Sequence, residues 1–206
     1  YPFKWEERRP FLGGKIIYVP DYYREHQRSL FPDFSTFFGN DHPVYVEYCS
    51  GNGEWVIAKA QENPEINWVA GELKFERVRK IHSKGHNLGL ENLMIISGEA
   101  LTFSREYLSD ASINAVFVNY PDPWPKDRHA KHRLIQAPFT SELKRTLKDK
   151  GTVTLVTDDT TYLQQMLTEM EGWTPKEGDF SDYGTSYFER LWRSHGLDIN
   201  YLHYER

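Results

Sequence analysis

Apolar and polar residues follow a regular order between residue 43 and about residue 171. Short apolar runs predict buried strands, and the stretches between them carry apolar residues every three or four positions, as helices packed on a sheet do. The expected strands cover residues 44–46, 66–70, 93–96, 113–118 and 152–157. The expected helices cover residues 54–63, 73–86 and 100–108, a stretch through Phe139, Leu143 and Leu147, and one through Leu163, Met166, Leu167 and Met170. Strands that alternate with helices predict an α/β protein with a mostly parallel, doubly wound sheet.

The two ends of the chain depart from this pattern. Residues 1–42 are rich in aromatic residues, proline and charge but show no clean period, so we expect a segment packed on the domain. The stretch from Trp173 through residues 199–203 predicts a closing pair of antiparallel strands. We therefore expect one domain over residues 43–206 with an N-terminal segment against it.

Composition narrows the class of protein. A chain of 206 residues with 39% apolar residues is long enough for one domain with a full core. The single cysteine argues against a disulfide framework and against a metal site built from cysteines. Because the sequence has neither an apolar run long enough for a membrane helix nor a signal peptide at its start, we expect a cytoplasmic protein.

Charge is distributed unevenly along the chain. The formal net charge is −5, but residues 126–150 hold eight Lys or Arg against three Asp or Glu, which makes this window +5 and the remainder −10. A basic island on an acidic body indicates a polyanion bound at one place, and a solvated helix face is the alternative.

Acidic residues follow three successive predicted strands. Glu47 lies at the end of the first strand, before a loop that contains Gly51 and Gly53, and Glu72 and Glu99 follow the second and third strands. The carboxyl ends of parallel strands form the ligand edge of such a sheet. Three acids there suit S-adenosylmethionine, whose ammonium, ribose and adenine groups all donate hydrogen bonds, although each acid alone could be an ordinary helix cap.

A proline-rich loop follows the fourth predicted strand. In this loop Asp122 stands between Pro121 and Pro123, and the rigid backbone would hold its carboxylate in place. A stiffened loop with a solvated acid is the alternative. The next residues are basic, and we expect phosphate contacts from Arg128, His129, Lys131 and Arg133. A metal site at His129 and His132 is the weaker interpretation, because no third ligand is evident, and we expect none.

These motifs together resemble a known family. Residues 46–53 (VEYCSGNG), Glu72 and residues 119–134 (NYPDPWPKDRHAKHRL) are similar to the bacterial tRNA (guanine-N7-)-methyltransferases. The resemblance extends from about residue 44 to the C-terminus, and includes Thr157-Asp158 and the pair Ser186 and Glu189. It implies a Rossmann-like class I methyltransferase fold that uses S-adenosylmethionine and acts on tRNA, usually on a guanosine of the variable loop. A monomer or a homodimer is compatible with it.

The resemblance also implies roles for individual residues. Asp122 is the expected catalytic acid. The residues expected at the methyl donor are Glu47, Cys49, Gly51, Gly53, Glu72, Glu99, Ala100, Asn119 and Asp122. Those expected at the guanine or the tRNA are Lys126, Asp158, Ser186 and Glu189. The chain departs from the family where Cys49 replaces the usual glycine, and where the last motif has Ser186, preceded by Thr185, in place of its usual threonine.

The chemistry of guanine N7 agrees with these roles. N7 already has a lone pair, so methyl transfer requires no strong general base. A carboxylate such as Asp122 would stabilise the positive charge that develops on the guanine ring and would accept its N1–H and N2–H groups. Tyr120 or Trp124 could stack on the displaced base. Two alternatives stay open at this point: a methyltransferase of a small molecule or protein, and a non-catalytic RNA-binding module.

Overall fold

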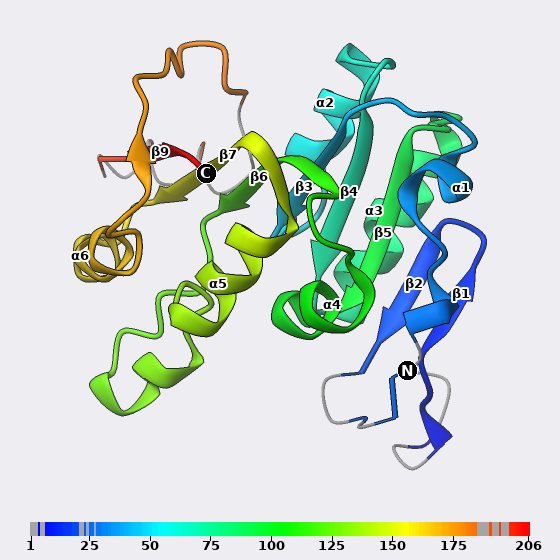
Figure 1. The fold of residues 1–206 in the computed structure, drawn as a ribbon, viewed down its shortest axis with the longest axis horizontal. Coiled ribbons are helices and arrows are strands. Elements are labelled where there is room, and N and C mark those ends of the chain that lie inside the picture. The colour runs from blue at the N-terminus through cyan, green and yellow to red at the C-terminus, as the bar shows by residue number, and fades with distance from the viewer. Residues whose placement is uncertain are drawn as a thin grey trace.

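The computed structural model describes residues 4, 7–20, 23, 25–26, 28–184, 190, 194 and 198–206. Within them one mixed sheet runs through the molecule in the strand order β1-β2-β5-β4-β3-β6-β7-β9-β8 (Figure 1). The strands are β1 Phe11–Gly13, β2 Ile16–Val19, β3 Val44–Tyr48, β4 Asn67–Glu72, β5 Leu93–Gly98, β6 Ile113–Asn119, β7 Leu147–Thr157, β8 Thr174–Pro175 and β9 Asn200–Glu205. The α-helices are α1 Phe34–Phe38, α2 Glu54–Glu62, α3 Phe75–Asn87, α4 Ala100–Tyr107, α5 Ala137–Thr146 and α6 Thr160–Glu169, and η2 Arg28–Leu30 and η3 Asp127–His132 are short 3-10 helices.

The middle of the sheet is parallel, as the alternating pattern predicts. Strands β2, β5, β4, β3, β6 and β7 pair in parallel, whereas β9 runs antiparallel to both β7 and β8. The expected α/β fold with an antiparallel C-terminal pair is therefore confirmed. Leu147 is an exception to the expected elements, because it begins β7 and does not belong to α5.

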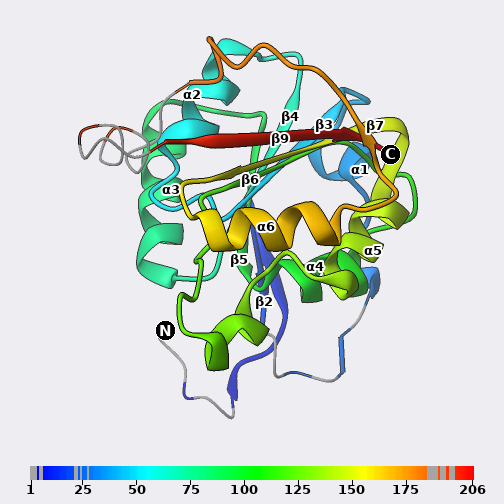
Figure 2. The same ribbon diagram turned by 90° about the vertical axis from the view of Figure 1, so that its left-hand side faces the viewer.

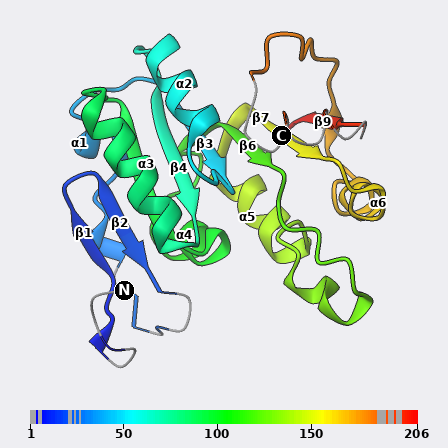
Figure 3. The same ribbon diagram turned by 180° about the vertical axis from the view of Figure 1, so that it is seen from behind.

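Helices cover both faces of the sheet. On one face, Val56 of α2 and Ile81 of α3 pack against Trp68 and Ile95 of the sheet. On the other face, α4, α5 and α6 bury a larger core with Phe103, Phe139, Leu143, Tyr162 and Met166. Figure 3 shows α2 and α3 in front of the sheet, on the side opposite α4 and α5, and Figure 2 shows α6 beside the edge that holds β7 and β9. The sheet is thus doubly wound.

The N-terminal segment contributes two strands that the sequence pattern did not predict. β1 and β2 form a hairpin around Gly14, which has a φ of 56°, and β2 pairs in parallel with β5. Ile17 and Val19 of β2 are fully buried. The pattern failed here because a strand of four consecutive apolar residues is too short to distinguish from other buried segments.

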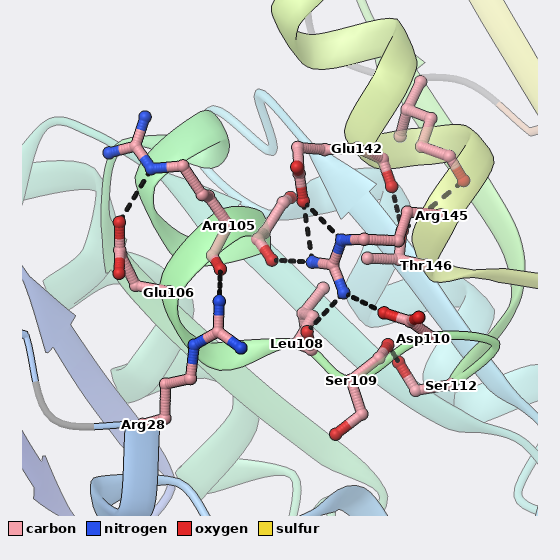
Figure 4. Close-up of polar contacts among 12 residues, drawn as sticks. Arg28, Arg105, Glu106, Leu108, Ser109, Asp110, Ser112, Glu142, Arg145 and Thr146 are labelled. Carbon is pink, nitrogen blue, oxygen red and sulfur yellow. Dashed lines mark hydrogen bonds and ion pairs between the residues drawn. The ribbon is translucent and has the colours of Figure 1, made fainter.

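Arg145 of α5 joins α4 to the rest of the helical layer (Figure 4). Its guanidinium donates to the backbone carbonyls of Ser104 (2.8 Å) and Leu108 (2.9 Å), and to the carboxylates of Asp110 (2.6 Å) and Glu142 (2.6 Å). Such a fork satisfies the free carbonyls near the end of α4. The end of α4 is therefore fixed against α5.

Within the described residues, none of the helices has the length and apolar character needed to cross a membrane.

Candidate functional site

The polar residues predicted at the strand ends meet at one edge of the sheet. Strands β3, β4 and β6 are neighbours, and Glu47, Glu72 and Asn119 lie at or next to their carboxyl ends. The amide of Asn119 donates to Glu47 Oε1 at 2.7 Å. The carboxylate of Glu72 accepts the backbone N–H of Gly51 at 2.9 Å. The structure thus brings these predicted residues and the glycine loop together.

The loop after β3 turns sharply because three of its residues have left-handed backbones. The φ angles are 64° at Cys49, 56° at Gly51 and 77° at Gly53. A Cβ atom on Gly53 would lie 2.7 Å from Cγ1 of Ile81, so a side chain there would collide with α3. Gly53 allows the loop to lie close to α3 as α2 begins.

Cys49 adopts this left-handed conformation although it is not a glycine, which has a conformational cost. Burial raises the pKa of its thiol, and the carboxylates of Glu72, Asp122 and Glu47 raise that pKa further. The thiol therefore stays protonated at neutral pH and is a poor nucleophile. Its place in the loop indicates a packing role.

Glu47 is a buried carboxyl group with an unusual environment. Its side chain is 1% exposed, and Oε2 has no hydrogen-bond partner within the described residues. Burial raises the pKa of Glu47 to about 7, against the lowering effect of the hydrogen bonds from Asn119 and Ser50. A buried carboxylate oxygen without a donor costs free energy unless a ligand supplies one. This arrangement suits a ligand with a cationic donor group.

Glu72 and Glu99 both hold local backbone in place. Glu72 Oε1 accepts the backbone N–H of Lys74 at 2.8 Å, while its other oxygen braces the glycine loop. Glu99 is the N-cap of α4, where its Oε2 accepts from the backbone N–H and the hydroxyl of Thr102, and Ala100 is the first residue of that helix. The helix-cap interpretation considered for a lone acid therefore applies to Glu99. Each of the two side chains retains further acceptor capacity for a ligand.

The proline-rich loop follows β6 and carries Asp122 as an exposed residue. Tyr120 and Trp124 have left-handed φ angles of 49° and 44°, and the backbone N–H of Tyr120 donates to the carbonyl of Val156 at 2.9 Å. The loop therefore bends on both sides of Asp122. Because β6 pairs with β3, this loop follows the strand next to the one that leads into the glycine loop.

The basic residues after Asp122 lie in two environments. Lys126, Arg128 and Lys131 are exposed, whereas Arg133 is only 6% exposed. The rings of His129 and His132 pack against Trp124, with centroids 5.9 Å and 5.2 Å away. Among the described residues, no three His, Cys, Asp or Glu side chains are grouped so that they could hold a metal ion.

Asp158 follows β7 at the same edge and is partly exposed. Burial raises the pKa of Asp158, and the neighbouring charge of Asp159 raises it further. Asp159 caps α6 by accepting the backbone N–H of Tyr162 at 2.6 Å. The remaining predicted substrate residues, Ser186 and Glu189, lie outside the described residues, as does Thr185, so no position is given for them.

Comparisons with known proteins agree with this geometry. A family model described as "Putative methyltransferase" matches residues 41–187. A tRNA (guanine-N(7)-)-methyltransferase of Chlamydia felis is 46% identical over 209 residues, which cover 98% of this chain and 93% of that protein. One from Staphylococcus epidermidis is 34% identical over 154 residues, which cover 70% of this chain and 71% of that protein. The chain belongs to the tRNA (guanine-N7-)-methyltransferase family.

Solved structures of methyltransferases share the fold. A 30S ribosomal A1408 methyltransferase from an uncultured bacterium aligns with a TM-score of 0.60 and 14% identity, covering 96% of this chain and 100% of that one. The aminoglycoside resistance methyltransferase NpmB1 aligns with a TM-score of 0.55 and 14% identity, covering 85% of this chain and 95% of that one. At such low identity the likeness concerns the fold alone.

Tyr183 joins the polar cluster at the strand ends, and the sequence did not reveal it. Its hydroxyl donates to Oδ1 of Asn119 at 2.7 Å, and Asn119 in turn donates to Glu47. The carbonyl of Tyr183 accepts from the indole N–H of Trp55 at 2.7 Å. Burial and the charge of Glu47 raise the pKa of Tyr183, so its hydroxyl remains a donor. No sequence signal separates this tyrosine from the other aromatic residues near the C-terminus, because its role depends on the fold.

Proposed function

We propose that this enzyme transfers the methyl group of S-adenosylmethionine to N7 of a guanosine in tRNA, in the variable loop and in the cytoplasm. The observation that carries the proposal is the buried carboxyl group of Glu47 with an unpartnered oxygen at the end of β3, next to the strand β6 whose following loop carries the exposed Asp122 and then exposed cations. The names of the relatives from Chlamydia felis and Staphylococcus epidermidis support the same activity.

The chemistry of the donor groups supports S-adenosylmethionine as the cofactor. This cofactor supplies a methyl group on a positively charged sulfur and contains no phosphate. The unpartnered Oε2 of Glu47 would accept from its ammonium group. Glu72 would accept from the ribose hydroxyls and Glu99 from the adenine amino group. Backbone atoms of the glycine loop and of Ala100, which follows Glu99, complete the set.

Asp122 would act on the guanine. Because N7 carries a lone pair, Asp122 need not remove a proton from it. A carboxylate near the ring stabilises the positive charge that develops there and accepts the N1–H and N2–H groups, which leaves N7 open. Asp158, at the end of the neighbouring strand, is a second acceptor for the guanine edge. Holding N7 in line with the methyl group supplies the rest of the catalysis.

The exposed cations would bind the phosphates of the tRNA. Lys126, Arg128 and Lys131 lie within a few residues of Asp122 and face solvent. Each phosphate contact releases counterions, so the logarithm of the binding constant should fall with the logarithm of salt concentration by about 0.7–0.9 per contact. His129, which is partly exposed, would add a hydrogen bond to a phosphate oxygen.

The experiment is nucleoside analysis of tRNA incubated with the enzyme and labelled S-adenosylmethionine. The wild type should form 7-methylguanosine. Asp122→Ala should still bind S-adenosylmethionine by calorimetry but should lose transfer by about 10²–10³-fold. Asp149→Ala is the matched control, because Asp149 is an exposed acid near the start of β7, far along the strand from the carboxyl ends that form the site. Full transfer by Asp122→Ala would overturn the role of Asp122, and a product other than 7-methylguanosine would overturn the proposed function.

A further inference from the structure

Arg133 differs from the other basic residues that follow Asp122. Its side chain is 6% exposed, whereas those of Arg128 and Lys131 face solvent. A phosphate contact requires an accessible guanidinium, and burying one requires partners for its charge and its donors. The guanidinium of Arg133 must therefore have partners within the fold.

The guanidinium of Arg133 binds the backbone of the loop that carries Asp122. Its Nε donates to the carbonyl of Pro123 at 2.6 Å, and Nη2 donates to the carbonyl of Trp124 at 3.4 Å. Pro123 is the residue directly after Asp122. Two donors of one planar group thus hold two successive carbonyls beside the catalytic acid.

The other side of the guanidinium binds α6. Nη1 donates to Oε1 of Gln165 at 2.6 Å, and the guanidinium carbon lies 5.2 Å from the ring centroid of Tyr162. Both partners are themselves fixed to the backbone of Ile135: Gln165 donates to its carbonyl at 3.0 Å, and the Tyr162 hydroxyl accepts from its N–H at 2.9 Å. Arg133 therefore connects the Asp122 loop to a rigid helix.

The loop needs such an external partner. Tyr120 and Trp124 have left-handed φ angles of 49° and 44°, which side chains other than glycine adopt only when the surroundings impose them. The three prolines at positions 121, 123 and 125 have no N–H to donate, so the loop has few donors with which to hold itself. Arg133 supplies donors from outside the loop, through its hydrogen bonds to the carbonyls of Pro123 and Trp124.

We propose that Arg133 is a positioning residue that holds the Asp122 loop against α6 and does not contact tRNA phosphate. Lysine cannot replace it, because a single ammonium group cannot reproduce a planar fork that reaches two carbonyls and an amide at once. This inference deepens the proposed function and rests on it for its kinetic test.

The kinetic test compares Arg133→Lys with Gln165→Met. Both variants should lower the single-turnover rate at saturating tRNA and S-adenosylmethionine by about 10- to 100-fold, since small misplacements of a reacting group cost that much. Arg133→Met, which removes the charge, and Gln165→Met should both leave the salt dependence of tRNA binding unchanged. Gln165 is neutral and lies on α6, so a lost phosphate charge cannot explain its effect. Arg128→Ala is the contrast, and it should lower the salt slope by about one contact.

A second measurement does not depend on activity. The backbone amide of Tyr120, which donates to the carbonyl of Val156 at 2.9 Å, should exchange faster by NMR in Arg133→Lys and in Gln165→Met, and at an unchanged rate in Arg128→Ala. The proposal is overturned if Arg133→Met, which removes the charge, lowers the salt slope while Arg133→Lys keeps the saturated rate, or if exchange of the Tyr120 amide does not change. If the wild type forms no 7-methylguanosine, the proposed function fails, and the exchange result still decides whether Arg133 holds the loop.

Discussion

The free energy of unfolding should depend on pH through the titration of Glu47, and Glu47→Gln should remove that part of the dependence. The pKa of Glu47 is about 7 in the folded chain, mainly because of burial, against an ordinary value of 4.5. Between these values the folded chain holds a proton that the unfolded chain releases. Stability from this group is therefore complete at low pH and is lost as the pH rises to about 7.

The size of the effect follows from the two pKa values. Each pH unit between them is equivalent to about 1.4 kcal/mol, so the wild type should lose roughly 2–3 kcal/mol between pH 5 and pH 8 through Glu47 alone. Glu47→Gln keeps an oxygen that accepts from Asn119 but cannot ionise. The constant cost of burying its amide cancels when the two pH values are compared.

The assay is urea unfolding of the wild type and Glu47→Gln at pH 5 and pH 8, without cofactor. Between pH 5 and pH 8 the wild type should lose about 2–3 kcal/mol of unfolding free energy through this group, and Glu47→Gln should not. The free energy of unfolding of the variant relative to the wild type should therefore rise by about that amount. Glu99→Gln is the control, because it also replaces a carboxylate by an amide at the same sheet edge, and an equal shift in both variants would contradict a role specific to Glu47. The reasoning is refuted if Glu47→Gln and the wild type lose stability in parallel. At the same time Glu47→Gln should bind S-adenosylmethionine more weakly.

Three further predictions concern the surroundings of the site. Gly53→Ala should cost about 1–3 kcal/mol of unfolding free energy and weaken cofactor binding, because its Cβ would meet Ile81 at 2.7 Å on a left-handed backbone. Tyr183→Phe keeps the ring but loses the hydroxyl that holds Asn119, so calorimetry should find S-adenosylmethionine bound about fivefold more weakly, equivalent to about 1 kcal/mol. Arg145→Ala should cost about 2–4 kcal/mol in urea unfolding, because the carbonyls and carboxylates it binds lose their donor.

Each of these predictions has a matched control. Gly89→Ala also places a side chain on a left-handed backbone, but its Cβ meets open space, so it should cost less than Gly53→Ala. Tyr45→Phe removes a hydroxyl within the same aromatic cluster and should leave cofactor affinity unchanged. Arg105→Ala breaks the half-exposed ion pair with Glu106 and should change stability by less than about 1 kcal/mol. Equal effects in a variant and its control would contradict the corresponding explanation.

The parallel sheet and the acids at its edge could be predicted because both follow from chain order. Apolar runs marked the strands, and parallel strands place their carboxyl ends together, so Glu47 and Glu72 had to converge. The role of Arg133 could not be predicted from the sequence. The sequence shows a run of basic residues, but it does not show which of their side chains is buried against the loop. Tyr183 was missed for the same reason, because it reaches Asn119 from 64 positions along the chain.

The costs in this fold are concentrated at the proposed site. Of the five non-glycine residues with positive φ in the described part of the chain, Cys49, Tyr120 and Trp124 lie in the two loops that follow β3 and β6. The buried carboxyl group of Glu47 lies at the end of β3 as well. Backbone strain and buried polar atoms without partners persist only where other contacts impose them, and they are common at functional sites. Substitutions that relieve these costs should therefore stabilise the protein without ligand while they reduce binding or transfer.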